Sequence, residues 1–205
     1  MFSAQEAQGD DSAKFAVMGI GNILFKDEGL GVYAAQYLQA NYEFSPAVDL
    51  IDGGTMGMNM IHTYQRYQRL IILDTISVDA AEQPGAIYCL NADVLQGLGH
   101  CRKTAHEIEV LQTLELGALA GDMADIQIIA MVPEEINDVS ISLSQTVLEA
   151  MPMFVETILA ELSKWGVQAA LKPGNKQSEK EGEKESEITF HDIISQYNQQ
   201  QAFNP

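Results

Sequence analysis

The chain has 205 residues, 46% of them hydrophobic, and its 29 Asp and Glu against 11 Lys and Arg give a net charge of -18. This composition supports one globular domain with a full core, whereas the strong negative charge excludes nucleic acid and anionic membrane surfaces as partners. No apolar stretch reaches the length of about 20 residues that spans a bilayer.

Short apolar runs alternate with longer segments of helical periodicity. In chain order, the sequence predicts a strand over 14–20, a helix over 29–40, a strand over 47–52, a helix over 56–67, strands over 69–75 and 85–90, a helix over 104–119, a strand over 125–132 and a helix over 144–165. This order predicts an α/β fold in which helices cover both faces of a mainly parallel sheet. About ten residues join the third and fourth strands, which is short for a parallel crossover, so the fourth strand is expected to be antiparallel.

Both ends of the chain differ in composition from the single α/β domain expected over 14–171. Residues 1–13 lack the basic and apolar regions of a signal peptide and are expected to be a flexible N-terminus. Residues 172–205 are expected to be a polar linker and a short amphipathic tail that adds little to stability. The tail has five apolar or aromatic residues at helical spacing: Ile188, Phe190, Ile193, Ile194 and Tyr197. Two cysteines are too few for a disulfide framework, which favours a cytoplasmic protein.

Carboxylates stand where the predicted strands end. Glu28 follows the first strand within GIGNILFKDEGLGV (19–32), Asp52 ends the second, Asp74 ends the third, and Glu134 follows the fifth. In open α/β sheets, ligands bind beyond the carboxyl ends of the parallel strands. We therefore expect these acids to meet at one rim of the sheet.

A histidine is expected at the same rim. Thr104 and Glu107 fit a capping box, which places His106 in the first turn of a helix. The helix dipole disfavours a protonated imidazole there, and a neutral imidazole is what a metal requires. Glu28, Asp74 and His106 therefore form a candidate site for a divalent metal.

Simpler interpretations of the same residues remain open. Asp27 is read first as an N-cap, and Glu28 can serve merely as a partner of the helix dipole. Cys101 and His106 could form a thiol–imidazole nucleophile pair, although no motif supports it. The stretch GIGNIL begins like a dinucleotide fingerprint, but Leu24 stands where the third glycine should be, so no nucleotide is expected.

Several pieces of this pattern occur together in one known family. They are GIGNILFKDEGLGV, DGGTMGM (52–58), LIILDTI (70–76), the isolated His106 ahead of a helix, and Pro133-Glu134 after the fifth strand. In these pieces, which cover 14 to about 165, the chain resembles the hydrogenase maturation endopeptidases. These proteases trim the C-terminal extension of the large subunit of nickel–iron hydrogenases.

The resemblance implies both a fold and an activity. The fold is a three-layer sandwich with a twisted five-stranded sheet, mostly parallel with one antiparallel strand. The activity is that of an aspartyl-type or metal-dependent endopeptidase that cuts the large-subunit precursor after nickel insertion. Nickel carried by the substrate would be recognised through Glu28, Asp74 and His106.

The resemblance also implies roles at the rim. The glycine turn Asp52-Gly53-Gly54-Thr55 falls where the family has a segment for substrate processing. The group that activates water stays open among Asp27, Asp52 and Glu134. A monomer that binds neither nucleic acid nor membrane is expected. The alternative is a non-enzymatic nickel-binding or chaperone module of hydrogenase assembly.

Overall fold

The structure, a computed structural model, describes residues 14–55, 61–76, 83–91, 124–173 and 187–202. Its helices and strands are, in chain order, β1 (Phe15–Ile20), η1 (Lys26–Gly29, a 3₁₀ helix), α1 (Leu30–Asn41), β2 (Tyr42–Ser45), β3 (Val48–Gly54), α2 (Ile61–Arg66), β4 (Arg69–Thr75), β5 (Ile87–Asn91), β6 (Asp125–Met131), α5 (Gln145–Lys164), β7 (Gln168–Leu171) and α6 (Phe190–Ala202). All five predicted strands are confirmed. The helix predicted over 104–119, and residues 56–60 of another, lie outside the described residues.

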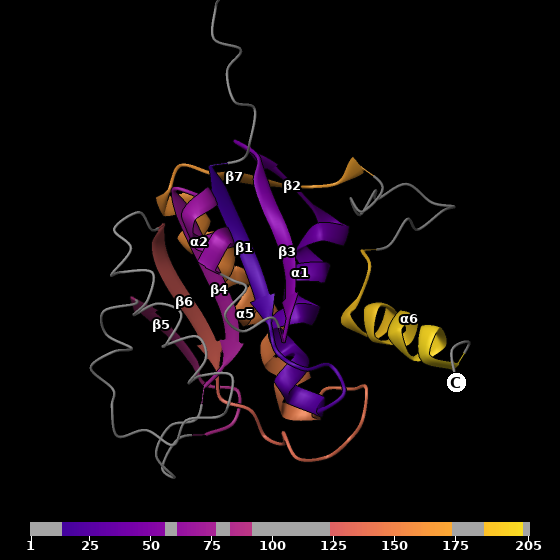
Figure 1. The fold of residues 1–205 in the computed structure, drawn as a ribbon. Coiled ribbons are helices and arrows are strands. Elements are labelled where there is room, and N and C mark those ends of the chain that lie inside the picture. The colour runs from indigo at the N-terminus through magenta and orange to yellow at the C-terminus, as the bar shows by residue number, and fades with distance from the viewer. Residues whose placement is uncertain (1–13, 56–60, 77–82, 92–123, 174–186, 203–205) are drawn as a thin grey trace, which may run out of the picture.

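A five-stranded sheet runs through the molecule in the order β3-β1-β4-β6-β5 (Figure 1). β1 pairs in parallel with both β3 and β4, and β4 pairs in parallel with β6. β5 pairs with β6 in the antiparallel sense, as the short connection before it predicted. The carboxyl ends of β1, β3, β4 and β6 therefore meet at one edge of the sheet, which we call the rim.

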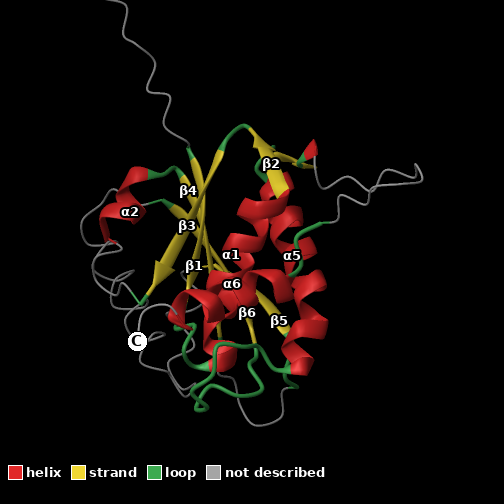
Figure 2. Ribbon diagram, turned by 90° about the vertical axis from the view of Figure 1, so that its right-hand side faces the viewer, coloured by secondary structure: helices red, strands yellow, loops and turns green. Residues whose placement is uncertain are grey.

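Helices lie on both faces of this sheet, with α2 on one side and α1, α5 and α6 on the other (Figure 2). Strand periodicity divides the core between the two faces, because successive side chains point in opposite directions. Val17 packs with α1 and α5, while its neighbours Ala16 and Met18 belong to the cluster on the other face. The predicted three-layer arrangement is confirmed.

The long helix α5 shows how the sequence specifies one of these layers. Ser144 is its N-cap, and the Ser144 hydroxyl accepts the N–H of Val147 at 3.3 Å. Apolar residues at intervals of three and four give it one buried stripe: Val147, Met151, Phe154, Val155, Ile158 and Leu162.

A two-stranded antiparallel sheet of β2 and β7 was not predicted from the sequence. Each strand has four residues, and the two are more than a hundred residues apart in the chain. Such short segments carry little periodicity, and their pairing depends on where α1 and α5 end.

The C-terminal helix α6 packs on the folded body. Ile193 and Ile194 are 3% and 8% exposed and belong to the same core cluster as α1 and α5. Phe190 stacks on Tyr37 of α1, with ring centroids 4.2 Å apart. The amphipathic helix expected in the tail is present, but the expectation that it adds little to the folded body is corrected. The expectation rested on the polar linker alone, and the polarity of the linker does not show that α6 packs against apolar residues of α1.

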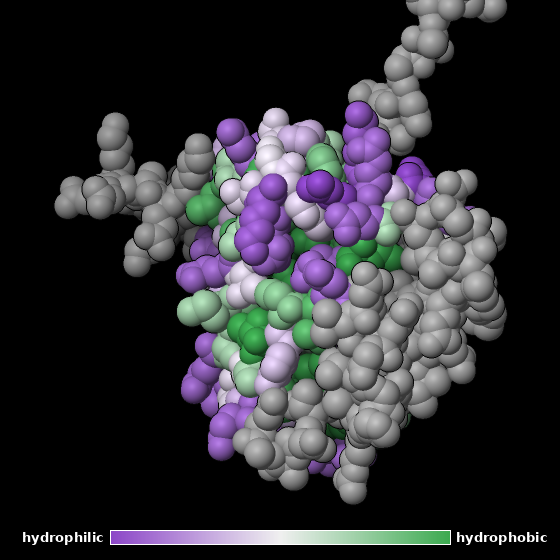
Figure 3. Space-filling view, turned by 90° about the vertical axis from the view of Figure 1, so that its left-hand side faces the viewer, coloured by the Kyte–Doolittle hydropathy of each residue, from purple (hydrophilic) through white to green (hydrophobic). Residues whose placement is uncertain are grey.

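The surface of the described residues is mixed in polarity. On the side that carries β5, the described residues form a surface in which hydrophobic and hydrophilic side chains are interspersed (Figure 3). The large hydrophobic side chains exposed in the described ranges are Leu24, Val139 and Met153, which lie in separate segments. Of the helices in those ranges, none has the length and apolar character needed to cross a membrane.

Candidate functional site

The loop between β1 and α1 lies at the rim and is held on both sides. The N–H of Gly21 donates to the carbonyl of Gly54 at 2.9 Å, which ties the loop to the glycine turn after β3. The N–H of Lys26 donates to the carbonyl of Ser140 at 3.0 Å, which ties it to the loop that follows β6. The loop is therefore a fixed part of the rim.

Two glycines let this loop and the start of α1 come close to the strands. A Cβ atom on Gly31 would lie 2.3 Å from the carbonyl oxygen of Leu73, so α1 begins directly against the end of β4. Gly21 has a φ of 130°, and a Cβ there would lie 1.8 Å from the carbonyl oxygen of Glu28. Any larger residue would force these segments apart.

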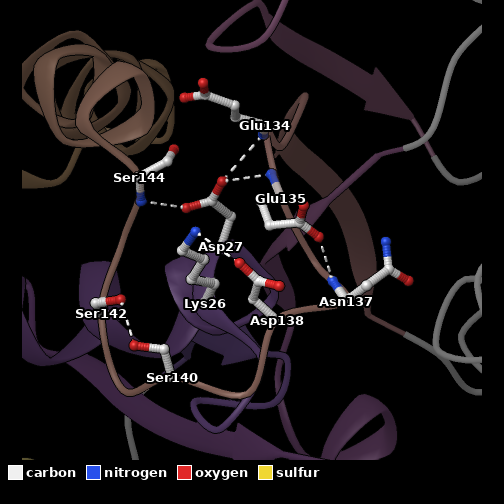
Figure 4. A network of polar contacts seen from close by, with 9 residues as sticks. All are labelled: Lys26, Asp27, Glu134, Glu135, Asn137, Asp138, Ser140, Ser142 and Ser144. Carbon is white, nitrogen blue, oxygen red and sulfur yellow. Dashed lines mark hydrogen bonds and ion pairs between the residues drawn. The ribbon is translucent and has the colours of Figure 1, made fainter.

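Asp27 is fully buried and joins three parts of the rim (Figure 4). Its Oδ2 accepts the N–H groups of Glu134 and Glu135 at 3.0 and 2.9 Å, and its Oδ1 accepts the N–H of Ser144 at 2.6 Å. The interpretation of Asp27 as the N-cap of the following helix is wrong. The N-cap residues of η1 and α1 are Phe25 and Gly29, and neither helix has a side-chain cap. Asp27 instead connects its loop to the β6 loop and to the N-terminus of α5.

The Asp27 carboxylate is well matched to these partners. Three backbone N–H groups require acceptors, and an ionised carboxylate supplies them without a donor of its own. The N-terminus of α5 also favours a negative charge. Both oxygens of Asp27 therefore accept backbone N–H groups, which fix its loop against the β6 loop and the N-terminus of α5.

Glu28 and Asp74 are brought to the same edge of the sheet. η1, which carries Glu28, contacts β4, which carries Asp74 near its carboxyl end. Asp74 is buried at 6% exposure, and its Oδ1 accepts the N–H of Thr75 at 2.7 Å. Glu28 is half-buried. Burying a carboxylate is costly unless hydrogen bonds or a cation compensate, and the hydrogen bond from Thr75 supplies part of that compensation for Asp74.

His106 and Cys101 lie outside the described residues, so the third predicted metal ligand and the alternative nucleophile pair stay predictions. Within the described ranges, no three His, Cys, Asp or Glu side chains gather closely enough to hold a metal ion.

The glycine turn forms one wall of a pocket of about 280 Å³ at the rim. Its Asp52 is exposed, and the Asp52 side chain accepts the N–H of Gly54 at 3.0 Å and the amide of Gln36 at 3.2 Å. The pocket is lined by Gly21, Asn22, Ile23, Leu24, Val32, Asp52, Gly54, Thr55 and Tyr197. The loop between β1 and α1 and the predicted substrate-binding turn are thus two sides of one cavity.

Glu134 lies beside the start of α5 and is exposed. Figure 4 shows its carboxylate directed away from Asp27, although its backbone N–H donates to Asp27. A hydrogen bond with the hydroxyl of Thr146 is the largest cause that lowers the pKa of Glu134, and Ser144 adds to it. Glu134 is therefore ionised at neutral pH.

A larger hollow of about 720 Å³ lies along the first half of β3, lined by residues that include Phe44, Val48 and Tyr67. It is at the opposite end of the strand from the glycine turn. In a parallel sheet, ligands are expected at the carboxyl ends, and the charged residues collected there favour the rim as the functional site.

Two contributors to the rim were missed from the sequence, Ser144 and Tyr197. Ser144 stands ahead of an apolar helical stripe and signals an N-cap, but nothing local indicates that its N–H meets Asp27, 117 residues away. Tyr197 belongs to the amphipathic pattern of the tail, which does not reveal its location.

Comparison with known proteins matches this chain and its fold to one family. The model of a family described as hydrogenase maturation protease matches residues 32–161. The hydrogenase expression/formation protein HoxM of Cupriavidus necator is 36% identical over 151 residues, which cover 73% of this chain and 74% of HoxM. The hydrogenase 2 maturation protease of Escherichia coli is 29% identical over 157 residues, 76% of this chain and 94% of that protein.

Solved structures agree with this assignment. The hydrogenase maturating endopeptidase HybD from E. coli superposes with a TM-score of 0.71 at 28% identity. The match covers 78% of this chain and 98% of HybD, so nearly the whole of HybD is contained within this fold.

Proposed function

The chain belongs to the hydrogenase maturation protease family, and from that premise we propose that it removes the C-terminal extension of a nickel–iron hydrogenase large-subunit precursor after nickel insertion. It is an endopeptidase, as the family and its named relatives are. The observation that carries the proposal is the meeting of the Glu28 loop, the Asp74 end of β4 and the glycine turn at one rim.

In the proposed reaction, the precursor brings its own nickel. Glu28, Asp74 and His106 are the ligands that would contact this ion, two hard carboxylate donors and one imidazole. Contact with an ion at a fixed point of the precursor would place one peptide bond at the rim. Such positioning lowers the entropic part of the barrier to hydrolysis.

The three carboxylates considered for activating water differ in their surroundings. Asp27 is buried, with both oxygens accepting backbone N–H groups, which supports a positioning role. Asp52 and Glu134 are exposed and can reach water. We therefore assign the general base to one of these two residues. We also propose that the protein acts as a monomer in the cytoplasm.

The test is incubation of the purified protein with nickel-loaded large-subunit precursor, followed by mass spectrometry of the large subunit. A shortened subunit is the expected product. The non-enzymatic alternative predicts binding of the precursor without any change in its mass.

A matched pair of variants tests the rim. Glu28→Gln preserves shape and removes one anionic ligand, so processing should fall by at least about a hundredfold, the range for loss of one key stabilising group. Glu43→Gln makes the same chemical change at an exposed position on β2 and should cleave normally. Equal cleavage by both variants would remove Glu28 from the site.

A further inference from the structure

The C-terminal helix α6 reaches the rim and supplies one side of the pocket at the glycine turn. Tyr197 of α6 lines that pocket together with Asp52 and Gly54 of the turn and residues 21–24 of the loop between β1 and α1. The matched family region ends at residue 161, before α6 begins. This wall of the pocket lies outside the segment that the family model matches, as does the opposite side formed by residues 21–24.

α6 is held at several points along its length. The side chain of Asn41 donates to the carbonyl of Ile188 and accepts its N–H, both at 2.9 Å. Ile193 is buried in the core, and Asn198 donates through Nδ2 to the carbonyl of Ile141 at 3.1 Å. These anchors lie on both sides of Tyr197 in the sequence, so they fix the place of its ring.

The Tyr197 ring and hydroxyl have separate partners. The ring meets Tyr33 edge-on, with centroids 5.8 Å apart and an interplanar angle of 76°. The hydroxyl lies 3.4 Å from Oδ2 of Asp52. Burial, with Asp52 as the second cause, raises the pKa of Tyr197 to about 12, so the phenol is neutral and can donate at physiological pH.

The chemistry of the pocket defines what it can accept. Ile23, Leu24 and Val32 supply apolar surface, and Leu24 is 40% exposed. Asp52 supplies a negative charge, and none of the described residues that line the pocket is Lys or Arg. An apolar or basic side chain fits these surroundings, whereas an acidic one would meet the Asp52 charge.

We propose that Tyr197, Leu24 and the glycine turn form a subsite that binds an apolar or basic segment of the precursor's C-terminal extension and selects among precursors. This inference rests on the proposed function, because it names where the substrate of that reaction is held. Aromatic side chains in such partly enclosed places carry a large share of binding energy. Because one wall of the subsite comes from α6, the selection among precursors would depend on the C-terminal helix of this chain.

The test measures steady-state cleavage of nickel-loaded precursor by three variants. Tyr197→Ala removes the wall and should raise KM about tenfold with kcat unchanged, the loss typical of one aromatic contact. Tyr197→Phe keeps the ring and should match the wild type. Gln196→Ala, an exposed neighbour on α6, is the control and should also match it.

Binding of a synthetic peptide of the extension separates this inference from the proposed function. If the wild type fails to cleave, the proposed function falls, yet weaker peptide binding by Tyr197→Ala would still support the subsite. An acidic residue introduced into the peptide segment should weaken binding further in the wild type than in Tyr197→Ala. Equal KM and equal peptide affinity for Tyr197→Ala and the wild type would overturn the inference. A Tyr197→Phe variant as impaired as Tyr197→Ala would overturn it too, by assigning the effect to the hydroxyl.

Discussion

Replacing Asp27 by asparagine should destabilise the fold although the side chain keeps its shape. The carboxylate accepts three backbone N–H groups, from Glu134, Glu135 and Ser144, in a fully buried position. An asparagine retains one acceptor oxygen and turns the other into an NH2 group. If the oxygen faces Glu134 and Glu135, the NH2 group faces the N–H of Ser144, and two donors oppose each other.

The magnitude follows from the bonds that change. A hydrogen bond to a charged group contributes about 1.5–3 kcal/mol and a neutral one about 1 kcal/mol. Asp27→Asn loses the bond from Ser144 and weakens the two that remain. We expect the free energy of unfolding to fall by about 2–4 kcal/mol, within the range for breaking a buried polar network.

Urea denaturation followed by fluorescence measures this loss, because Trp165 is the single tryptophan of the chain and stacks on Phe15 of β1. Asp138→Asn is the matched control. Asp138 is exposed and pairs with Lys26 at 3.2 Å, so its loss should cost less than about 1 kcal/mol. If Asp27→Asn were no less stable than Asp138→Asn, the three hydrogen bonds would not hold the rim together.

Three further outcomes are expected. Ile193→Ala should lower the free energy of unfolding by about 2–4 kcal/mol in the same denaturation assay, since it empties a buried site under α6; a loss near zero would mean that α6 does not dock in solution. Just before α6, the N–H and hydroxyl of Thr189 donate to Oδ2 of Asp192 at 2.9 and 2.6 Å and cap the helix. These bonds lower the pKa of Asp192 below the ordinary 3.8, so the stability from this cap is present above pH 3.8 and is lost as the pH falls through the lower folded value. The difference in Tm between Asp192→Ala and the wild type should therefore persist at pH 5 and shrink below 3.8, and a difference that stays constant would contradict the cap. Calorimetric titration with nickel should show that the affinity falls as the pH drops through about 6. Asp74→Asn should weaken nickel binding at every pH, whereas His106→Ala should also flatten the pH profile; an unchanged profile in His106→Ala would remove His106 from the site.

Much of the fold could be predicted because the signals are local. Four consecutive apolar residues followed by Asp74 predict a buried strand, whichever strands lie beside it. β4 occupies 69–75 as predicted. The antiparallel β5 followed from the length of a connection, which is too short to carry a chain back across the sheet. The convergence of Glu28, Asp52 and Asp74 at one rim followed from the topology of parallel strands.

Only the tertiary structure decided which segments distant in sequence come into contact. Asp27 stands in a glycine-rich loop where a helix begins, so local rules favour a cap, but its partners are 107, 108 and 117 residues further on. α6 has an amphipathic pattern that predicts a helix, yet which surface covers Ile193 depends on the packing of α1 and α5. Hydrophobic periodicity predicts which face of a helix or strand is apolar. Which element packs against that face depends on the shape of the whole core.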